Sequence, residues 1–387
     1  MEANEIPMHL RREKLALQYA IKIKSSPNNP AHQIIFDPNY EDLYANKPNT
    51  IPPFGIRIKT ALQEVCQDIN VISPSKMMEI PPWTVPPVEI DLTLAENKKD
   101  PLEAPIQVNR FRELKNKYEN HIPIYTDGSK DGNKVGAGII VEAETQKIGL
   151  NGSATVFTAE LTALKKALEL IAHNQSSHFV VFTDSLSALE AIQSRDFNHP
   201  IVVDICVDYF NLLTINKHVV LAWVPSHMGI PGNEKADRAA KAALSEPVSV
   251  QNIPFKDLYP QIRKKVKNSW QDLWDQCEHN KLHAIQPELG EWHGGSRLKR
   301  REEVVLARAR IGHTHMTHSF LLKSEPIPEC FSCSCFFTVK HFLVDCDDYA
   351  HIRRQFYNVD SIKELFDEIN PTTILDFIRA SGLFHRF

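Results

Sequence analysis

The sequence predicts an α/β fold in which a mixed sheet is covered by helices. Between residues 122 and 244, apolar runs too short for helices alternate with segments of helical periodicity, in the order β-β-β-α-β-α-α-β-α. Turn-forming residues separate the first three runs, which read PIYTDGSK, VGAGIIVEA and QKIGLNG. The next segment, TAELTALKKALELIAH, places apolar residues on one stripe of a helix. Strands and helices in such an order are typical of a sheet with helices packed on its faces.

Length and composition define the broad class of protein. A chain of 387 residues exceeds the usual size of one hydrophobic core, so we expect two or three folding units. The formal net charge of −4 means that any basic surface for nucleic acid is local. The N-terminus is charged and is interrupted by Pro7, and no apolar run approaches the ~20 residues that span a bilayer. We therefore expect an intracellular protein of the cytoplasm or nucleus, with neither a signal peptide nor a membrane segment.

Changes in composition predict how the chain is divided. The segment MHLRREKLALQYAIKIK at 8–24 has helical spacing, prolines recur from Ile72 to Val108, and a second linker is expected near Pro247 to Pro254. The predicted parts are a helical region at 1–70, a Pro-rich linker at 71–117, the α/β domain at 118–246, a basic helical region at 255–325, a Cys/His module at 326–360 and a helical tail at 361–387.

The basic helical region has two interpretations. Its segments RKKVK and RLKRR are interleaved with Trp270, Trp274 and Trp292, an arrangement that fits a phosphate-binding surface. Solvated helix faces explain the same residues equally well.

Four carboxylates from different elements are candidates for one site. Asp127 and Asp184 each end an apolar run, where a strand would present them at the ligand-binding edge of a sheet. Glu160 and Asp237 lie near the starts of two predicted helices. A cluster of such acids needs cations, and oxygen ligands favour Mg²⁺ or Mn²⁺. Two such ions can hydrolyse a phosphodiester bond, so the set predicts cleavage of a nucleic-acid backbone.

Each acid also has a structural explanation. Asp184 could cap a helix, and Glu160 suits the positive end of a helix dipole. Asp127 could start a turn, and Asp237 could be a surface acid. Single residues therefore leave both interpretations open.

The segments TDGSK, TVFTAELTALKKAL, FTDSLSAL and WVPSHMGIPGNEKADRAAKAA together resemble the type 1 ribonuclease H domain in order and approximate spacing. The resemblance implies a ribonuclease H-like fold, with a five-stranded mixed sheet and flanking helices. It implies an endoribonuclease that uses two Mg²⁺ or Mn²⁺ ions to hydrolyse the RNA strand of an RNA/DNA hybrid. By this resemblance Asp127, Glu160, Asp184 and Asp237 are the metal-binding acids, and His227 is a mobile-loop histidine that assists proton transfer or product release.

Contacts with the substrate are harder to assign. Ser129 and Asn233 are polar neighbours of the acids, and we expect them to touch the substrate backbone. Between Ile192 and Asp204 the sequence has no long basic handle of the kind that some family members use to hold the hybrid. Affinity for the hybrid is therefore expected to depend on other parts of the chain.

Three cysteines and one histidine near the C-terminus have the spacing of a zinc site. Cys330, Cys333, His341 and Cys346 supply four soft ligands, which fits a closed, structural Zn²⁺ site resembling a CCHC zinc knuckle. Cys335 could replace Cys333, and the neighbouring histidines could compete as ligands: His313, His315 and His318. Reduced, buried cysteines are the other interpretation. Such a module could also bind RNA or DNA.

The flanks carry a resemblance of their own. The segments LARARIGHTHMTHSFLL, PECFSC and HFLVDCDDYAHIRRQF are similar to the C-terminal tails of Jockey-like non-LTR retrotransposon polyproteins, and EANEIPMHLRREKLALQYAIK resembles the stretch after their reverse transcriptase. The one Asp-Asp pair, Asp347-Asp348, lacks the apolar strand context of a polymerase. We therefore expect a C-terminal fragment of such a polyprotein or a gene derived from one.

Three functions fit these patterns. An active hybrid-specific endoribonuclease is favoured because all four acids are present. The alternative is a catalytically inactive nucleic-acid-binding remnant of a retroelement. An integrase-like transferase fits less well because that class lacks the fourth acid and the histidine loop. The sequence indicates no oligomeric state.

Overall fold

The structure is a computed structural model that describes residues 5–39, 41–47, 49–75, 78, 80–95, 104–290, 292 and 298–387. It divides into two compact units. One unit is Lys14–Arg263, and the other joins Met1–Glu13 to Lys264–Phe387. Parts of the predicted helical region, of the Pro-rich linker and of the basic region lie outside the described residues: 1–4, 40, 48, 76–77, 79, 96–103, 291 and 293–297.

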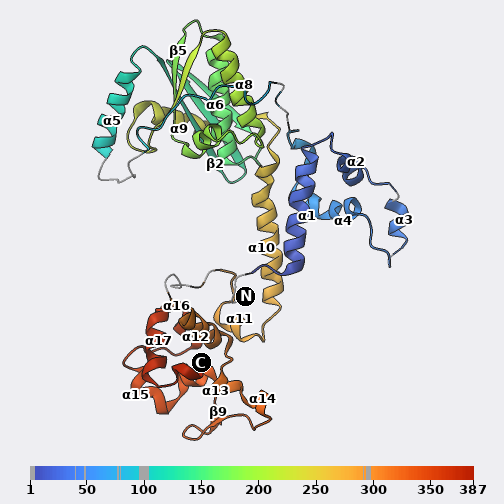
Figure 1. Cartoon of the computed structure of the whole chain (residues 1–387), viewed down its shortest axis with the longest axis vertical. Coiled ribbons are helices and arrows are strands. Elements are labelled where there is room, and N and C mark those ends of the chain that lie inside the picture. The colour runs from blue at the N-terminus through green and yellow to red at the C-terminus, as the bar shows by residue number, and fades with distance from the viewer. Residues whose placement is uncertain are drawn as a thin grey trace. The chain divides into compact units, whose positions relative to one another are not determined.

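A seven-stranded mixed sheet forms the centre of the larger unit (Figure 1). In spatial order its strands are β1 (Ile90–Asp91), β6 (His218–Trp223), β5 (His178–Thr183), β2 (Ile122–Asp131), β3 (Lys134–Val141), β4 (Glu144–Leu150) and β7 (Val248–Val250). The five predicted strands are β2 to β6. The two additional strands lie at the edges, where β1 pairs in parallel with β6 and β7 with β4. Two or three residues are too few to produce a periodic pattern, so the sequence predicted five strands.

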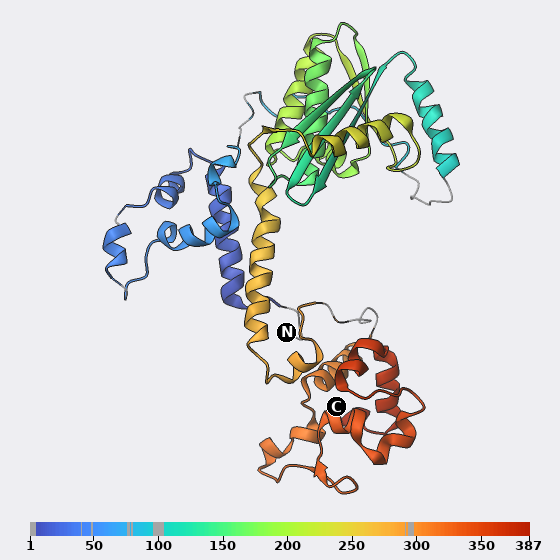
Figure 2. The ribbon, with the colours of Figure 1, turned by 180° about the vertical axis from the view of Figure 1, so that it is seen from behind.

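Helices cover both faces of the sheet. Helices α6 (Val156–His173) and α8 (Pro200–Thr214) lie side by side, with α7 (Leu186–Gln193) between β5 and α8 in the chain (Figure 1). Seen from behind, α9 (Pro231–Ala243) lies across the strands (Figure 2). A Cβ atom on Gly138 would lie 2.4 Å from the α9 backbone, so the missing side chain lets this helix rest directly on β3.

The segment 71–117, expected to be a Pro-rich linker, contains ordered elements that pack on the domain. Strand β1 extends the sheet, and α5 (Ala104–Lys117) places Phe111 edge-on against Phe182 of β5, with ring centroids 5.3 Å apart. The second expected linker, near Pro247 to Pro254, likewise contains β7. The recurring prolines between Ile72 and Val108 hide the short strand from the sequence pattern, because the strand is defined by its pairing partner.

Further helices precede and follow the strands of the sheet in the sequence. The helix expected at 8–24 is α1 (Met8–Lys24), which is followed by α2 (Pro30–Phe36), α3 (Glu41–Ala45), α4 (Phe54–Val65) and the turn η1 (Ile69–Val71). After the sheet come η3 (Phe255–Leu258) and α10 (Tyr259–Asp275). Trp270 and Trp274 of α10 are buried, and Trp292 stacks under the Arg310 guanidinium at 4.1 Å. These tryptophans are therefore packing residues. Their packing favours the interpretation of the basic segments as solvated helix faces over that of a phosphate-binding surface interleaved with tryptophans.

The C-terminal half of the smaller unit is one helical body with a single core. Phe342, Leu365, Phe377 and Phe387 are fully buried together. The predicted Cys/His module and helical tail therefore share a core. The elements are α11 (Lys281–Ile285), α12 (Arg300–Ile311), α13 (His315–His318), α14 (Phe320–Lys323), β8 (Glu329–Cys330), β9 (Cys335–Phe336), η4 (His341–Asp345), η5 (Asp347–Tyr349), α15 (Ala350–Arg353), α16 (Ile362–Glu368), α17 (Pro371–Ala380) and η6 (Phe384–Arg386). In the described part of the chain, no helix is long and apolar enough to cross a bilayer.

A buried carboxylate fastens β1 to the end of α5. Asp91 accepts hydrogen bonds from Lys117 Nζ and Tyr118 Oη, both at 2.7 Å, and from the backbone and hydroxyl of Thr93. Burial acts to raise the pKa of Asp91, but these hydrogen bonds outweigh it and hold the pKa well below the usual range. The ionised carboxylate is therefore the form that stabilises the fold.

We expect Asp91→Asn to lower the free energy of unfolding at pH 7 by about 1–3 kcal/mol, because charge-assisted hydrogen bonds are lost in a buried position. Urea unfolding of the full chain measures this change. Because the folded pKa of Asp91 is depressed, its stabilising contribution is present above an unfolded pKa of about 3.9 and is lost as the pH falls below that value. Asp131→Asn, at an exposed position of β2, is the control. Equal stabilities of the two variants would contradict the role of Asp91.

Candidate active site

The candidate site lies where the parallel pairing of β2 with β5 ends. Strands β2 and β5 pair in parallel as far as Thr126 and Thr183. The residue that follows each of these threonines in the chain is an aspartate, Asp127 after Thr126 and Asp184 after Thr183. Strand β2 continues to Asp131 by pairing with β3, so Asp127 lies inside a strand and not at its end as expected. The two carboxylates nevertheless meet where the parallel ladder ends, because their strands are in register up to that point.

Glu160 reaches the same place from α6. The helix begins at Val156, so Glu160 lies just beyond the first turn in which it was expected. A Cβ atom on Gly128 would lie 2.6 Å from the backbone nitrogen of Glu160, so α6 rests directly on β2 at this point. One carboxylate oxygen from each of Asp127, Glu160 and Asp184 lies within 4.8 Å of the others. The structure therefore brings three of the four predicted acids together.

The fourth acid belongs to a neighbouring group on α9 and the loop before it. Carboxylate oxygens of Asp237 and Glu234 and a ring nitrogen of His227 lie within 4.8 Å of one another. Asp237 also pairs with Lys241 at 2.8 Å. His227 is exposed and has a positive φ of 57°, in a tight loop that turns back toward α9. Glu234 was not among the predicted site residues, although its place one helical turn before Asp237 in GNEKAD was a signal.

The two residues expected to touch substrate occupy different environments. Asn233 is buried, and its Nδ2 donates a hydrogen bond to Asp184 Oδ2 at 3.2 Å. Its contact is therefore with one of the acids. Ser129 follows Asp127 by two positions in β2, so it lies on the same face of the sheet, and it is half-buried.

Burial and like charge perturb the acids. Burial, reinforced by the charges of Asp184 and Asp237, raises the pKa of Asp127 to about 7. The pKa of Glu160 is also raised, by burial and then by the charges of Asp127 and Asp184. Glu160 Oε2 is buried and has no hydrogen-bond partner in the structure. Clustered, desolvated oxygen donors with an unsatisfied buried atom fit a hard divalent cation such as Mg²⁺ or Mn²⁺.

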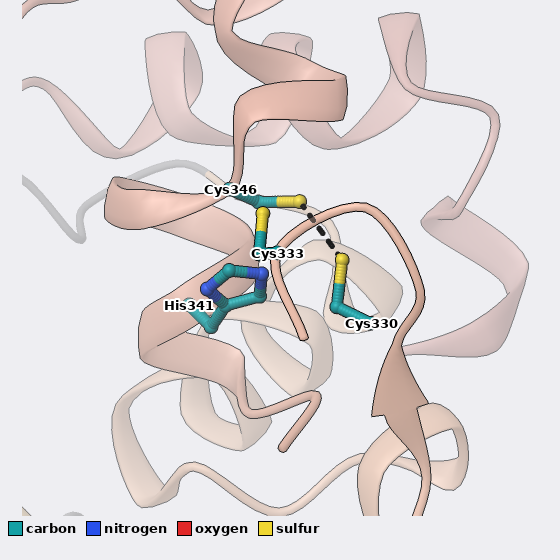
Figure 3. A group of neighbouring side chains, drawn as sticks. All are labelled: Cys330, Cys333, His341 and Cys346. Atoms are coloured by element: carbon teal, nitrogen blue, oxygen red, sulfur yellow. Dashed lines mark hydrogen bonds between the residues drawn. The ribbon is translucent and has the colours of Figure 1, made fainter. Parts of the chain in front are cut away.

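The four predicted zinc ligands converge in the C-terminal body. Cys330, Cys333, His341 and Cys346 offer ligand atoms that all lie within 4.8 Å of one another, and the sulfur atoms and the imidazole ring point toward one another (Figure 3). The Cys330 and Cys346 sulfur atoms are 3.8 Å apart. Two sulfur atoms at ~2.3 Å from a tetrahedral Zn²⁺ are separated by ~3.8 Å, so the arrangement fits zinc.

The alternative ligands are less well placed. Cys335 Sγ is 3.5 Å from His341 Nδ1, but Cys335 is exposed and does not belong to the group of four. His313 and His318 stack on each other with ring centroids 3.8 Å apart, and neither is in the group. Cys333 therefore takes the position for which Cys335 was the alternative.

One comparison bears on the larger unit. Residues 119–245 match the family model of RNase H. The chain thus contains an RNase H domain, and this domain holds the strands β2 to β6 and the helices α6 to α9. All four predicted acids and His227 lie inside the matched segment. Strand β1, helix α5, strand β7 and the turn η3 lie outside it.

We expect Asp184→Asn to raise the free energy of unfolding of the metal-free protein at pH 8 by about 1 kcal/mol, because one charge that repels Asp127 is removed. The shape of the side chain is kept, and an amide oxygen at position 184 can still accept from Asn233. Thermal unfolding in the presence of EDTA measures the change.

The gain should disappear near pH 5. Because the folded pKa of Asp127, about 7, exceeds an unfolded value of about 3.9, the wild-type protein loses stability as the pH rises through this range. Near pH 5, which is below the folded pKa of Asp127, this carboxyl is neutral in the folded protein and no longer repels Asp184. A variant that is less stable than wild type at pH 8 would show that repulsion does not dominate the site.

Proposed function

We propose that the RNase H domain is an endoribonuclease that hydrolyses the RNA strand of RNA/DNA hybrids with two divalent metal ions. The observation that carries this proposal is the cluster of Asp127, Glu160 and Asp184, with oxygen atoms within 4.8 Å, at the end of the β2/β5 ladder. The charge of Asp237 acts on Asp127, so the fourth acid is electrostatically part of the same site. The match of the surrounding segment to the RNase H family supports the same activity.

Different residues of the chain would have different roles in hydrolysis. Asp127, Glu160 and Asp184 would hold one Mg²⁺ or Mn²⁺ ion, and Asp237 would complete the site of the second. When bound, such ions polarise the phosphate and lower the pKa of an attacking water. Asn233 fixes the Asp184 carboxylate through its hydrogen bond. Water adds to phosphorus and the bond to the 3′-oxygen breaks, which leaves a 5′-phosphate and a 3′-hydroxyl.

His227 is suited to move the proton that this reaction releases. Its imidazole is exposed, lies on a loop and faces the carboxylates of Glu234 and Asp237. An imidazole ring nitrogen can accept a proton and later donate it to solvent, which is the chemistry that this transfer needs. Ser129 presents a hydroxyl on the face of β2 that carries Asp127, where it can donate to a phosphate of the substrate.

We also infer that Cys330, Cys333, His341 and Cys346 hold a structural Zn²⁺ ion. The 3.8 Å separation of two of the sulfur atoms and the chemistry of the four donors support this inference. Cys346 precedes η5, and His341 opens η4, whose Phe342 is in the core, so an ion would fasten the β8–β9 hairpin to that core. A retroelement origin is a proposal that rests on the resemblance of the flanking segments. Contact of this module with RNA or DNA and an intracellular location remain proposals from the sequence.

We expect the full chain with Mg²⁺ to cut a labelled RNA/DNA hybrid and to leave single-stranded RNA and duplex DNA intact. Asp184→Asn should lower the rate of cleavage by at least about a hundredfold, because a residue that holds a metal ion is lost. Gel analysis of the RNA fragments measures the rate. Asp131→Asn is a matched control outside the cluster. Binding of the hybrid without cleavage by a folded protein would support the inactive remnant in place of the enzyme.

We expect the reduced protein to contain one zinc ion per chain, measured by elemental analysis after gel filtration. Cys333→Ser should lose the ion, because a hydroxyl is a poor replacement for a thiolate ligand. Cys335→Ser should keep it, because Cys335 lies outside the group of four. Zinc that is lost from the Cys335 variant and kept by the Cys333 variant would reverse the assignment of these two cysteines.

A further inference from the structure

A buried acid from beyond the matched RNase H segment reaches back to the helix that carries Glu160. Asp257 lies in η3 and is 3% exposed. Its Oδ2 accepts a hydrogen bond from the backbone nitrogen of Thr155 at 3.0 Å. Its Oδ1 accepts from the hydroxyl of Thr155 at 3.0 Å and from that of Thr158 at 2.9 Å. One carboxylate therefore binds the N-cap residue and the first turn of α6.

The backbone before α6 is held from a second direction. Lys130 of β2 donates from Nζ to the carbonyl oxygens of Gly152, at 3.2 Å, and Ala154. Lys130 follows Asp127 by three residues in the same strand. The start of α6 is thus fixed between the strand that carries one acid and the segment that carries Asp257.

The fit between α6 and β2 leaves little room for movement. Glu160 lies two residues after Thr158, and its backbone nitrogen would be 2.6 Å from a Cβ atom on Gly128. Backbone rests on backbone at this contact, so no flexible side chain can compensate for a shift of the helix. A displacement of the first turn of α6 is therefore passed on to the Glu160 carboxylate.

We propose that Asp257 is a positioning residue of the active site, which holds Glu160 beside Asp127 by capping α6. This inference rests on the proposed function, because it assigns Asp257 a role in the affinity of the acid cluster for metal ions. It also means that the working catalytic unit extends past residue 245, where the family match ends, to include η3. Phe255 and Leu258, which are buried on either side of Asp257, anchor this turn.

The test is Mn²⁺ binding to the full chain, measured by electron paramagnetic resonance of the free ion. We expect Asp257→Asn, which has a single oxygen for three donors, to weaken binding about tenfold, as loss of a residue that orients a metal ligand does. Thr158→Val removes one of the three hydrogen bonds and keeps the shape of the side chain. It should weaken binding less, in the same direction.

Asp204→Asn is the matched control. Asp204 also binds α6, through Lys165 at 2.7 Å, at a point beyond Glu160. We expect this variant to bind Mn²⁺ as wild type does. Thermal unfolding of all four proteins without metal separates the effects of stability from those of position. Normal Mn²⁺ affinity in folded Asp257→Asn and Thr158→Val proteins, or equal losses in the Asp204 control, would overturn the proposal and leave Asp257 a purely structural cap.

Failure of the proposed function gives a different result. A wild-type chain that binds Mn²⁺ and cuts no hybrid contradicts the endoribonuclease, while the comparison of variants still decides the role of Asp257. A wild-type chain that binds no Mn²⁺ overturns both.

Discussion

The mutual repulsion of carboxylates at the end of the β2/β5 ladder is the constraint on which the larger unit depends. Two ionised carboxylates 4–5 Å apart repel by roughly 3–4 kcal/mol at an effective dielectric constant of about 20. Here three such groups share one place, and Asp127 and Glu160 are buried. Burial, and then the charges of the neighbouring carboxylates, raises the pKa of both Asp127 and Glu160. The surrounding fold must supply the energy that holds them there.

Close backbone packing holds the elements that carry the acids against one another. Helix α6 rests on β2 at Gly128, and α9 rests on β3 at Gly138, with alanines of α9 filling the contact. These contacts bring Glu160 and Asn233 to the two aspartates from opposite faces of the sheet. Elements outside the matched segment add to the same body, because β1 and β7 extend the sheet and η3 caps α6. The RNase H domain of this chain is therefore larger than its family pattern.

In the smaller unit, an apolar core and a Cys/His group lie together. The Cys/His group lies beside an apolar core whose members extend from Ile285 of α11 to Phe387. The Cys/His group and these apolar side chains thus belong to one helical body. The sequence predicted a zinc module and a separate tail here, because cysteine spacing and helical periodicity are separate signals in a sequence. Only the shared core shows that they belong together.

The sequence by itself determined the order of the central strands and helices and the residues that form the candidate site. Alternating apolar runs, a local property of the chain, predicted β2 to β6. The resemblance of four motifs to the ribonuclease H domain pointed to Asp127, Glu160, Asp184 and Asp237. The tertiary structure decided what depends on distant partners: the edge strands β1 and β7, the docking of α5, the contact of Asn233 with Asp184, and the grouping of Cys333 with Cys330, His341 and Cys346. It also brought Asp257 into hydrogen-bond contact with Thr155, which lies 102 residues away in the chain. Such contacts leave no periodic signal, because hydrogen bonds and pairing across the fold are set by which surfaces meet.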